Sequence, residues 1–247
     1  MNRTRFIPGP PTIYDAIDTV QVVVDQLLAR STPRRVLEAG CGSYGHLELR
    51  PDDHMVGIDI SERQLARNTI LQEKICGDLQ TQPLPPESFN LVVCWYVLEH
   101  LQHPRMAFDR MVQSLRPGGL LVLAQPSLLS PKGLLTRFTP HWFHVWVYRN
   151  LFGRTNAGRD DNPPFPTYLR WTIRPAALRS YGKGHGLDVV HDLYFEDYTQ
   201  RKLRTDKPLF RALYAVMNLV LRLLSVGQYG AYHTDYVVVM QKSRGAS

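Results

Sequence analysis

A short apolar segment that ends in a glycine-rich turn constrains the fold of this chain more than any other feature. Residues 36–38 are predicted to form a buried strand, and the turn after it spaces Gly40, Gly42 and Gly45 as GxGxxG. Glycine lets the backbone turn tightly and leaves no Cβ between the backbone and a ligand. The pattern therefore predicts a strand followed by a ligand-binding turn in an α/β fold.

Strand and helix patterns alternate along the rest of the chain. The expected strands are residues 36–38, 55–58, 75–78, 91–95, 120–124, 187–195 and 235–241. The expected helices are residues 12–30, 62–71 (capped by Ser61), 107–115 and 175–186. Such alternation predicts a parallel sheet with helices on both faces, and the two late strands indicate an added antiparallel edge.

The composition is that of an ordinary globular protein. Of the 247 residues, 44% are hydrophobic and 21% are charged, which excludes a disordered tail, a collagen-like fibre and a coiled coil. We expect a single domain over 1–247, with an N-terminal helical segment at 1–33 and a ligand-binding core at 34–126. The remaining segments, 127–171 and 196–234, are expected to be insertions that cover a substrate.

The net charge and the cysteines limit the classes of partner and the cellular compartment that we expect for the protein. The chain has 29 Lys and Arg against 22 Asp and Glu, a formal charge of +7 that admits nucleic acid, an anionic membrane or an acidic small molecule. Cys41, Cys76 and Cys94 form no CxxC pair, which indicates a reduced, cytoplasmic protein. Arg3 and Arg5 are followed by prolines rather than by an apolar stretch, so we expect no secretory signal.

Acidic residues occur at the ends of three successive predicted strands. Glu38 suits an ammonium group and would repel a pyrophosphate, Asp59 can accept hydrogen bonds from two ribose hydroxyls, and Asp78 can accept one from an exocyclic amine. The carboxyl ends of parallel strands meet at one edge of a sheet, where ligands bind. The three acids fit a cationic adenosyl ligand better than NAD, the competing dinucleotide.

With these residues in place, the chain resembles the class I S-adenosylmethionine-dependent methyltransferases, in particular the methyltransferase type-11 group. The resemblance is carried, in the family's order, by VLEAGCGSYG, VGIDIS, CGDLQTQPLPPESFNLVVCWYVLEHL and LRPGGLLVLAQPS. It implies a Rossmann-like, mostly parallel seven-stranded sheet with an antiparallel last strand, helical insertions forming a lid, and S-adenosylmethionine as cofactor. The chain departs from the family in its extra Tyr44 and in having only residues 46–50 where a helix is expected.

The resemblance also implies which residues contact the methyl donor. In chain order these are Glu38, Gly40, Cys41, Gly42, Asp59, Ile60, Asp78, Leu79, Cys94 and Trp95. The first four are expected to hold the methionine part and the next two to contact the ribose and the adenine. Asp78 and Leu79 are expected at the adenine edge, and the last two on the side of methyl transfer.

The candidate catalytic residues are three histidines. His141 and His144 share one helical face with Tyr148, at i, i+3 and i+7, and His100 follows the fourth strand. A hydroxyl acceptor needs a base for its proton, and His144, His141 and His100 are the candidates in that order. The competing interpretation is that these are core histidines of a helix packed on the sheet. No third ligand accompanies the histidine pair, so no metal is expected.

Aromatic residues beside these histidines indicate a wall for a flat or lipophilic acceptor. The expected substrate contacts are Trp142, Trp146, Tyr148, Tyr168 and Arg170. The segment 162–165 spells NPPF, a match to the [DN]PP[YF] signature of amino-directed methyltransferases. In those enzymes the signature follows the fourth strand, whereas here it lies well after the fifth. We interpret the match as a coincidental loop, which weakens the case for a nucleic-acid partner.

The C-terminal third combines basic and apolar residues. A basic segment at 201–207 precedes an apolar run at 209–227. Polar residues interrupt this run on one narrow stripe, at Arg211, Asn218, Arg222 and Ser225, so the run is a poor membrane span. We expect the helix to cover the substrate mouth. A homodimer contact and peripheral membrane contact through 201–227 are the alternatives.

The sequence therefore predicts an S-adenosylmethionine-dependent methyltransferase that acts on a small, hydrophobic acceptor, as in natural-product or lipid and quinone biosynthesis. O-methylation is favoured over C- or N-methylation, and no nucleic-acid partner is expected. The alternatives are an RNA or protein methyltransferase and a non-catalytic adenosyl-binding or membrane-peripheral scaffold. An NAD-linked oxidoreductase is disfavoured by Glu38 and by the Gly118-Gly119 turn. The expected location is the cytoplasm, and peripheral contact with a membrane is the alternative.

Overall fold

A computed structural model describes residues 10–31, 33–128, 130–150, 153–159, 161–224, 226 and 230–244. Arg3, Arg5 and Ser225, on which some of the sequence expectations rest, lie outside these ranges. The elements in chain order are α1 (Ile13–Leu27), β1 (Arg35–Ala39), β2 (His54–Asp59), α2 (Glu62–Arg67), β3 (Glu73–Cys76), β4 (Phe89–Trp95), η1 (Leu98–His100), α3 (Pro104–Ser114), β5 (Leu115–Pro126), α4 (Pro131–Phe138), α5 (His141–Asn150), η2 (Trp171–Ile173), α6 (Pro175–Gly184), β6 (Leu187–Phe195), α7 (Tyr198–Asp206), α8 (Pro208–Leu224) and β7 (Asp235–Lys242).

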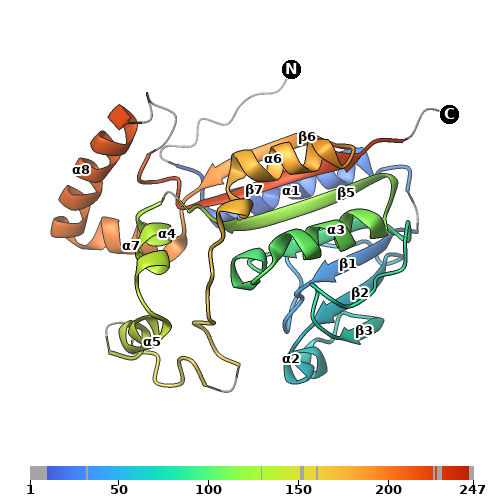
Figure 1. Ribbon diagram of the computed structural model, residues 1–247, viewed down its shortest axis with the longest axis horizontal. Coiled ribbons are helices and arrows are strands. Elements are labelled where there is room, and N and C mark those ends of the chain that lie inside the picture. The colour runs from blue at the N-terminus through green and yellow to red at the C-terminus, as the bar shows by residue number, and fades with distance from the viewer. Residues whose placement is uncertain are drawn as a thin grey trace.

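The strands form one seven-stranded sheet in the order β3-β2-β1-β4-β5-β7-β6 (Figure 1). The pairs β2–β3, β1–β2, β1–β4 and β4–β5 are parallel, and β7 is antiparallel to both of its neighbours. The predicted mostly parallel sheet with an antiparallel last strand is confirmed. The late strands do not both form the edge, however, because β7 is inserted between β5 and β6.

The two faces of the sheet are covered by different helices. Side chains alternate along each strand, so Leu37 faces one layer and its neighbour Val36 the other. Phe108 of α3 and Leu178 of α6 pack on the Leu37 face, while Val20 of α1 packs on the opposite face (Figure 1). Burial of each such side chain contributes roughly 1.5–3 kcal/mol. The expected helices on both faces are therefore present.

Helix α2 begins where the sequence predicts but ends earlier than predicted. Ser61 caps it as expected, with its Oγ accepting from the amide of Gln64 at 3.2 Å. The helix ends at Arg67, so its predicted continuation to residue 71 is wrong. Asn68 is extended instead, with ψ 114°, and its Nδ2 donates to the carbonyl of Gly42 at 3.3 Å. Leaving the helix allows Asn68 to support the glycine-rich turn.

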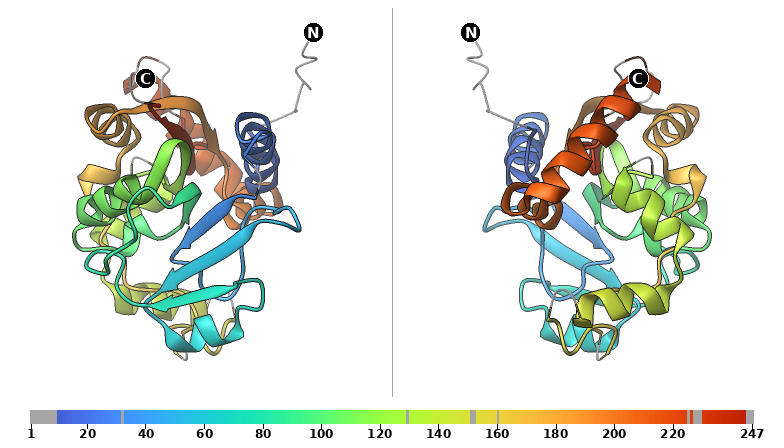
Figure 2. Two further views of the ribbon diagram at one scale, coloured as in Figure 1. Left: turned by 90° about the vertical axis from the view of Figure 1, so that its right-hand side faces the viewer. Right: turned by 90° about the vertical axis from the view of Figure 1, so that its left-hand side faces the viewer.

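The two insertions lie at the carboxyl ends of the strands. α4 and α5 follow β5, and α7 and α8 follow β6, so the four helices gather beyond the same end of the sheet (Figure 1). α8 lies on the outside of the molecule, as Figure 2 shows in its right-hand view. In the described part of the chain, no helix combines the length and the apolar character needed to cross a bilayer.

Candidate active site

A cavity of about 1450 Å³ opens at the carboxyl ends of the strands. Its wall combines the glycine-rich turn after β1, the ends of β2, β3 and β4, and side chains from α4, α5, α7 and α8. Pockets for a single small ligand are usually about 300–1,000 Å³. The cavity therefore has room for two ligands side by side, one on the β1–β3 half and one under the insertion helices.

The glycine-rich turn packs too closely on its surroundings to carry side chains. Gly40 has φ +75°, and a Cβ there would lie 2.3 Å from Cγ2 of Val97. Gly42 has φ +52°, and a Cβ there would lie 2.8 Å from Oε1 of Gln64. The amide of Gly40 donates to the carbonyl of Ile58 at 2.7 Å. Both glycines line the cavity, so a ligand meets bare backbone at this point.

Two of the predicted acids face the cavity with fixed orientations. Asp59 accepts from the amide of Ser61 at Oδ1 and from the amide of Gly42 at Oδ2, both at 2.8 Å. Asp78 accepts from the amide of Gln80 at 2.8 Å. Both acids line the cavity. A carboxylate oxygen has two lone pairs, so each acid keeps acceptor capacity for hydroxyl or amine donors of a ligand.

Glu38, the third predicted acid, is buried behind the turn rather than on the cavity wall. Its Oε1 accepts from the amide of His46 at 3.4 Å, and its Oε2 lies 3.8 Å from Nδ1 of the same residue. The His46 ring stacks on Trp95, with 5.5 Å between ring centroids. In this arrangement Glu38 supports the turn, and His46, which the sequence did not single out, lines the cavity.

Most of the other predicted donor contacts line the cavity, but Cys94 does not. Cys41, Ile60, Leu79 and Trp95 are on the wall. Cys94 is fully buried in the core, on the face of the sheet opposite to that of its neighbour Trp95, because adjacent strand residues point to opposite faces. Burial, and then the charge of nearby carboxylates, raises the pKa of its thiol. The structure therefore separates Cys94 from the side on which methyl transfer was expected.

The loop after α5 closes over the β2 end of the cavity. Ser61 donates its hydroxyl to Oδ2 of Asp161 at 2.8 Å, a contact between residues one hundred positions apart. Pro163, Pro164 and Phe165, from the NPPF segment, line the cavity as well. The segment thus belongs to the wall, although it follows β5 rather than β4.

Glu99 is a buried carboxyl group on the cavity wall that sequence reasoning missed. It lies in η1, directly after β4, and its Oε2 has no hydrogen-bond partner among the described residues. Burial raises the pKa of Glu99 to about 8. The available signal was an acid inside the apolar run VLEHL at the carboxyl end of a strand. Such perturbed, unpaired acids in a cavity are typical of functional sites.

The three candidate histidines occupy different positions. His100 lines the cavity, and its Nδ1 bonds to the carbonyl of Pro166 at 2.8 Å, so Nδ1 carries the proton and Nε2 is left as an acceptor 3.9 Å from Glu99 Oε1. His144 also lines the cavity, and its Nε2 is hydrogen-bonded to Oγ1 of Thr139 at 2.6 Å. Burial lowers the pKa of both rings.

His141 does not line the cavity. It lies against His144, with 6.4 Å between ring centroids, and its Nδ1 is buried without a hydrogen-bond partner in the described part of the chain. The predicted shared helical face therefore exists, but only one of its two imidazoles reaches the wall.

A charged cluster stands at the β5–β7 end of the cavity. Lys132, at the start of α4, places Nζ 3.4 Å from Oδ2 of Asp197 and 3.7 Å from Oδ1 of the buried Asp235. Burial opposes the charge on Lys132, but these two carboxylates raise its pKa. Tyr96 lies nearby with φ +57°, and burial raises the pKa of its hydroxyl. Lys132 and Tyr96 give this end of the wall its polar character.

The predicted aromatic wall is present, but α5 presents different residues to the cavity. Trp142 and Trp146 are 68% and 49% exposed and do not line it. Phe143 and Val147, one position further along the same helix, do line it, together with Tyr148. Both pairs have the i, i+4 spacing of one helical face, so the sequence pattern alone did not decide between them.

Of the two other expected substrate contacts, Tyr168 lines the cavity and Arg170 does not. Arg170 lies over the Tyr168 ring at 5.6 Å and donates from Nε to the carbonyl of Gln102 at 3.2 Å. Arg170 is therefore placed to hold the ring of Tyr168 from outside the cavity.

Helix α8 completes the wall on the side of the insertions. Phe210, Leu213, Tyr214 and Met217 line the cavity, and the Tyr214 hydroxyl donates to Oε1 of Gln200 at 2.5 Å. The polar stripe of α8 points elsewhere, since Oδ1 of Asn218 accepts from the amide at residue 231 at 3.1 Å. The inner face of α8 is thus mainly apolar, as expected of a cover.

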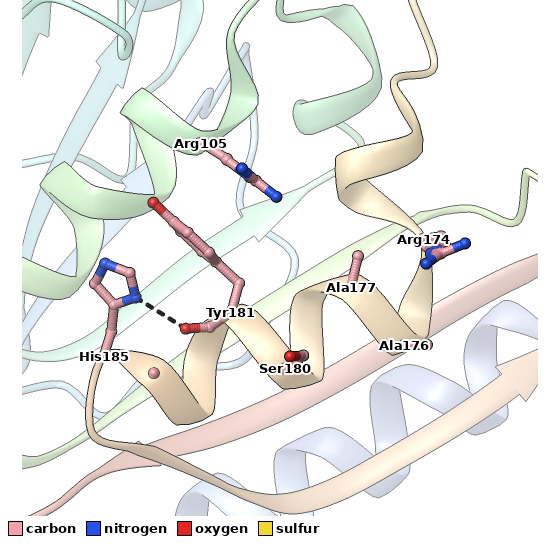
Figure 3. A pocket seen from close by; sticks show the side chains of 8 residues that line it. Arg105, Arg174, Ala176, Ala177, Ser180, Tyr181 and His185 are labelled. Atoms are coloured by element: carbon pink, nitrogen blue, oxygen red, sulfur yellow. Dashed lines mark hydrogen bonds between the residues drawn. The ribbon is translucent and has the colours of Figure 1, made fainter.

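A second cavity, of about 510 Å³, lies away from the sheet edge, between α3 and α6 (Figure 3). The guanidinium of Arg105 lies 4.9 Å from the centroid of the Tyr181 ring, and Nδ1 of His185 bonds to the Tyr181 carbonyl at 2.8 Å. None of the residues expected from the sequence to bind donor or acceptor lines it. The sequence motifs therefore point to the larger cavity.

Comparison with known proteins agrees with this geometry. Residues 14–192, well over half of the chain, match the family described as "Methyltransferase domain". Among solved structures, an S-adenosylmethionine-dependent methyltransferase from Mesorhizobium loti superimposes with a TM-score of 0.51 at 16% identity, covering 90% of this chain and 96% of that one. The YcgJ protein from Bacillus subtilis gives 0.53 at 14% identity, covering 90% and 98%. These likenesses show the fold.

Curated relatives share about half of the chain. A protein of Mycolicibacterium smegmatis described as a "probable S-adenosylmethionine-dependent methyltransferase" is 31% identical over 131 residues, 51% of each chain. A malonyl-acyl-carrier protein O-methyltransferase of Dechloromonas aromatica is 31% identical over 134 residues, 49% of each. A tRNA (carboxymethyluridine(34)-5-O)-methyltransferase of Arabidopsis thaliana is 29% identical over 146 residues, 53% of this chain and 34% of that one. This chain spans about half or less of these relatives' lengths.

Proposed function

The chain belongs to the methyltransferase domain family, and on this basis we propose that it is an S-adenosylmethionine-dependent enzyme that methylates a hydroxyl group of a small, hydrophobic acceptor. The observation that carries the proposal is the position of Glu99. Glu99 lines the same cavity as the glycine-rich turn and the apolar insertion helices, and its Oε2 has no hydrogen-bond partner among the described residues. An acceptor of this kind fits natural-product or lipid and quinone biosynthesis.

The β1–β3 half of the cavity fits the donor. S-adenosylmethionine supplies a methyl carbon bonded to a positively charged sulfur. The bare backbone at Gly40 and Gly42 admits the methionine part, because any Cβ there would meet neighbouring atoms within 3 Å. Asp59 accepts from the ribose hydroxyls and Asp78 from the adenine amine, with Ile60 and Leu79 packing on the ring.

The other half of the cavity fits an apolar acceptor. The side chains that favour such a molecule are Phe143, Val147, Tyr168, Phe210, Leu213 and Met217. Burying a flat or lipophilic molecule against them is favoured at roughly 25 cal/mol for each Å² of apolar surface removed from water. The same enclosure keeps water from the methyl group.

Glu99 serves as the base in this proposal. The acceptor oxygen forms a bond to the methyl carbon as the carbon–sulfur bond breaks, and the hydroxyl proton passes to Oε2 of Glu99. The electron pair of the broken bond stays on sulfur, which becomes neutral. His144 ranks second because its Nε2 is already hydrogen-bonded to Thr139. The Nε2 of His100 lies beside Glu99 Oε1. His141 ranks last as a candidate base because it does not line the cavity.

A product assay with matched variants tests the proposal. The enzyme is incubated with S-adenosylmethionine and panels of hydrophobic phenols, carboxylic acids and amines, and mass spectrometry locates the added methyl group. We expect O-methylated products and a loss of about 10²–10⁴-fold in turnover for Glu99→Gln, with binding of S-adenosylhomocysteine intact. Glu48→Gln, at an exposed acid, is the matched control. Methyl groups found only on nitrogen or carbon would overturn the assignment of oxygen.

The same product assay tests the alternative classes of acceptor. The malonyl-acyl-carrier protein O-methyltransferase among the relatives supports an oxygen acceptor, whereas the tRNA methyltransferase keeps RNA as the alternative. Total tRNA and a protein extract are therefore added as separate substrates. Methylation of either in place of the small molecules would favour the RNA or protein alternative. Donor binding without turnover on any class would favour the non-catalytic scaffold.

A further inference from the structure

The outer face of α8 carries an exposed apolar stripe. Its side chains are 47% to 79% exposed and repeat at intervals of four and three residues, at Leu209, Leu213, Val216, Val220 and Leu223. Soluble proteins rarely leave contiguous apolar surface of this kind without a partner, and such surface marks a protein or membrane contact. Of the stripe residues only Leu213 also lines the cavity, so most of the stripe is separate from the inner residues of α8.

The cavity lies directly behind this stripe. Tyr214 and Met217 face inward and line the cavity, and α8 stands at the periphery of the molecule in Figure 2. Phe210 and Leu213 line the cavity and are also exposed, at 38% and 50%. An edge of the cavity therefore adjoins the outer stripe, and whatever covers the stripe also lies next to this edge.

The segment that carries the stripe is basic. Segment 198–224, which contains α7 and α8, has six Lys and Arg residues and a single acid, Asp206. Lys202, Lys207, Arg211 and Arg222 are exposed. A helix with an apolar face on one side and cations on the opposite side is typical of helices that lie in the interface of an anionic bilayer.

A second copy of the chain fits the stripe less well. α8 contains no Asp or Glu, so two paired α8 helices would have no acid within the helices to balance their cations. Arg211 and Arg222 lie on the side of α8 opposite the stripe, so a pair formed through the stripe would not bring an acid to either of them. Anionic lipid headgroups, in contrast, supply the negative charge that this basic segment lacks.

We propose that the α7–α8 segment docks on the anionic surface of a lipid bilayer, with the outer stripe of α8 in the boundary between headgroups and acyl chains. The edge of the cavity at Phe210 and Leu213 then faces the bilayer, and a lipophilic acceptor enters from it. Docking follows from the stripe and its cations alone. Entry of the acceptor rests in addition on the proposed function.

Vesicle flotation with the full chain tests docking. We expect binding to vesicles of phosphatidylglycerol and phosphatidylcholine that is at least tenfold stronger than to pure phosphatidylcholine and that weakens as salt rises. The double variant Val216→Glu, Val220→Glu changes only exposed positions and should lower binding at least tenfold. Val22→Glu, at an exposed position on α1, is the matched control and should bind as the wild type. Unchanged S-adenosylhomocysteine binding confirms that each variant is folded.

The remaining outcomes overturn the proposal or limit it in a defined way. Failure of the wild type to float with anionic vesicles overturns docking, and so does a double variant that still floats. A wild-type dimer that the double variant makes monomeric, without vesicle binding, assigns the stripe to a second copy. If vesicles bind but no O-methylated product forms, docking stands and the proposed function fails. In that case only the acceptor's route of entry is withdrawn.

Discussion

The carboxylate of Asp59 accepts a hydrogen bond from the backbone amide of Gly42, with 2.8 Å between Oδ2 and the nitrogen. The contact joins the end of β2 to the glycine-rich turn after β1. One acid therefore holds the turn in place and faces the cavity with its remaining lone pairs. Both the shape and the charge of the β1–β3 half of the cavity, the proposed donor site, therefore depend on the Asp59 side chain.

Replacing Asp59 by Ala should weaken the affinity for S-adenosylhomocysteine at least tenfold. The variant loses both the ribose acceptor and the support of the turn, and hydrogen bonds to charged groups are worth roughly 1.5–3 kcal/mol. Isothermal titration calorimetry measures the effect, with Asp52→Ala, at an exposed acid seven residues earlier, as the control. Equal affinities for Asp59→Ala and the wild type would remove Asp59 from the donor site.

Gly40→Ala should unfold at a clearly lower temperature than the wild type. The added methyl group would lie 2.3 Å from Cγ2 of Val97, and φ of +75° disfavours any residue with a Cβ. Overpacking and backbone strain together cost roughly 2–4 kcal/mol. Thermal unfolding followed by circular dichroism checks this. Gly184→Ala, where a Cβ meets nothing within 4 Å, should leave the transition almost unmoved.

The contact between Ser61 and Asp161 should help to retain the donor. Without the 2.8 Å hydrogen bond, the loop after α5 loses a direct link to the β2 end, and Asp161→Ala should weaken S-adenosylhomocysteine binding about threefold to tenfold. That range corresponds to roughly 0.5–1.5 kcal/mol for one hydrogen bond. A double-mutant cycle with Ser61→Ala isolates the pair. Fully additive effects would show that the loop is held by other contacts.

The sheet and the glycine-rich turn at its carboxyl edge were predictable from the sequence because strand periodicity and glycine-rich turns are local signals. The directions in which individual side chains point were harder to predict. Glu38 occupies the expected place in β1, yet its side chain turns behind the glycine turn toward His46. On α5, Phe143 and Val147 face the cavity in place of Trp142 and Trp146. Which of two equally spaced apolar pairs turns inward depends on the neighbouring insertions, and the sequence of one helix does not contain that information.

Glu99 shows a different limit of sequence reasoning. An acid within VLEHL is ambiguous, because the same letters describe an exposed cap and a buried base. Its significance depends on burial by the segment around Tyr168 and Leu169, whose amides both donate to the Glu99 carbonyl, at 2.8 and 3.1 Å. These residues lie about seventy positions away in the sequence. The histidines were more conspicuous because their ordinary pKa values already suit a base.

Glu99 should also make the stability of the protein depend on pH. Its pKa is about 8 in the folded state against an ordinary value of 4.5, so the folded state binds an extra proton between these limits. The stability associated with this group is fully present below about pH 4.5 and is lost as pH rises through about 8. Urea unfolding from pH 5 to 9 should therefore show Glu99→Gln gaining stability relative to the wild type. A constant difference would contradict the raised pKa.

The pH dependence of catalysis should have the opposite sign. Only the ionised carboxylate can take the acceptor's proton, so kcat/KM should rise about tenfold per pH unit below pH 8 and level off above it. Glu99→Gln should remove the rise along with most of the activity, while His144→Gln should keep the inflection near pH 8. The assay uses an acceptor whose hydroxyl has a pKa far from 8, so that ionisation of the acceptor is not mistaken for ionisation of Glu99. If the inflection instead disappears in His144→Gln and persists in Glu99→Gln, the base is His144.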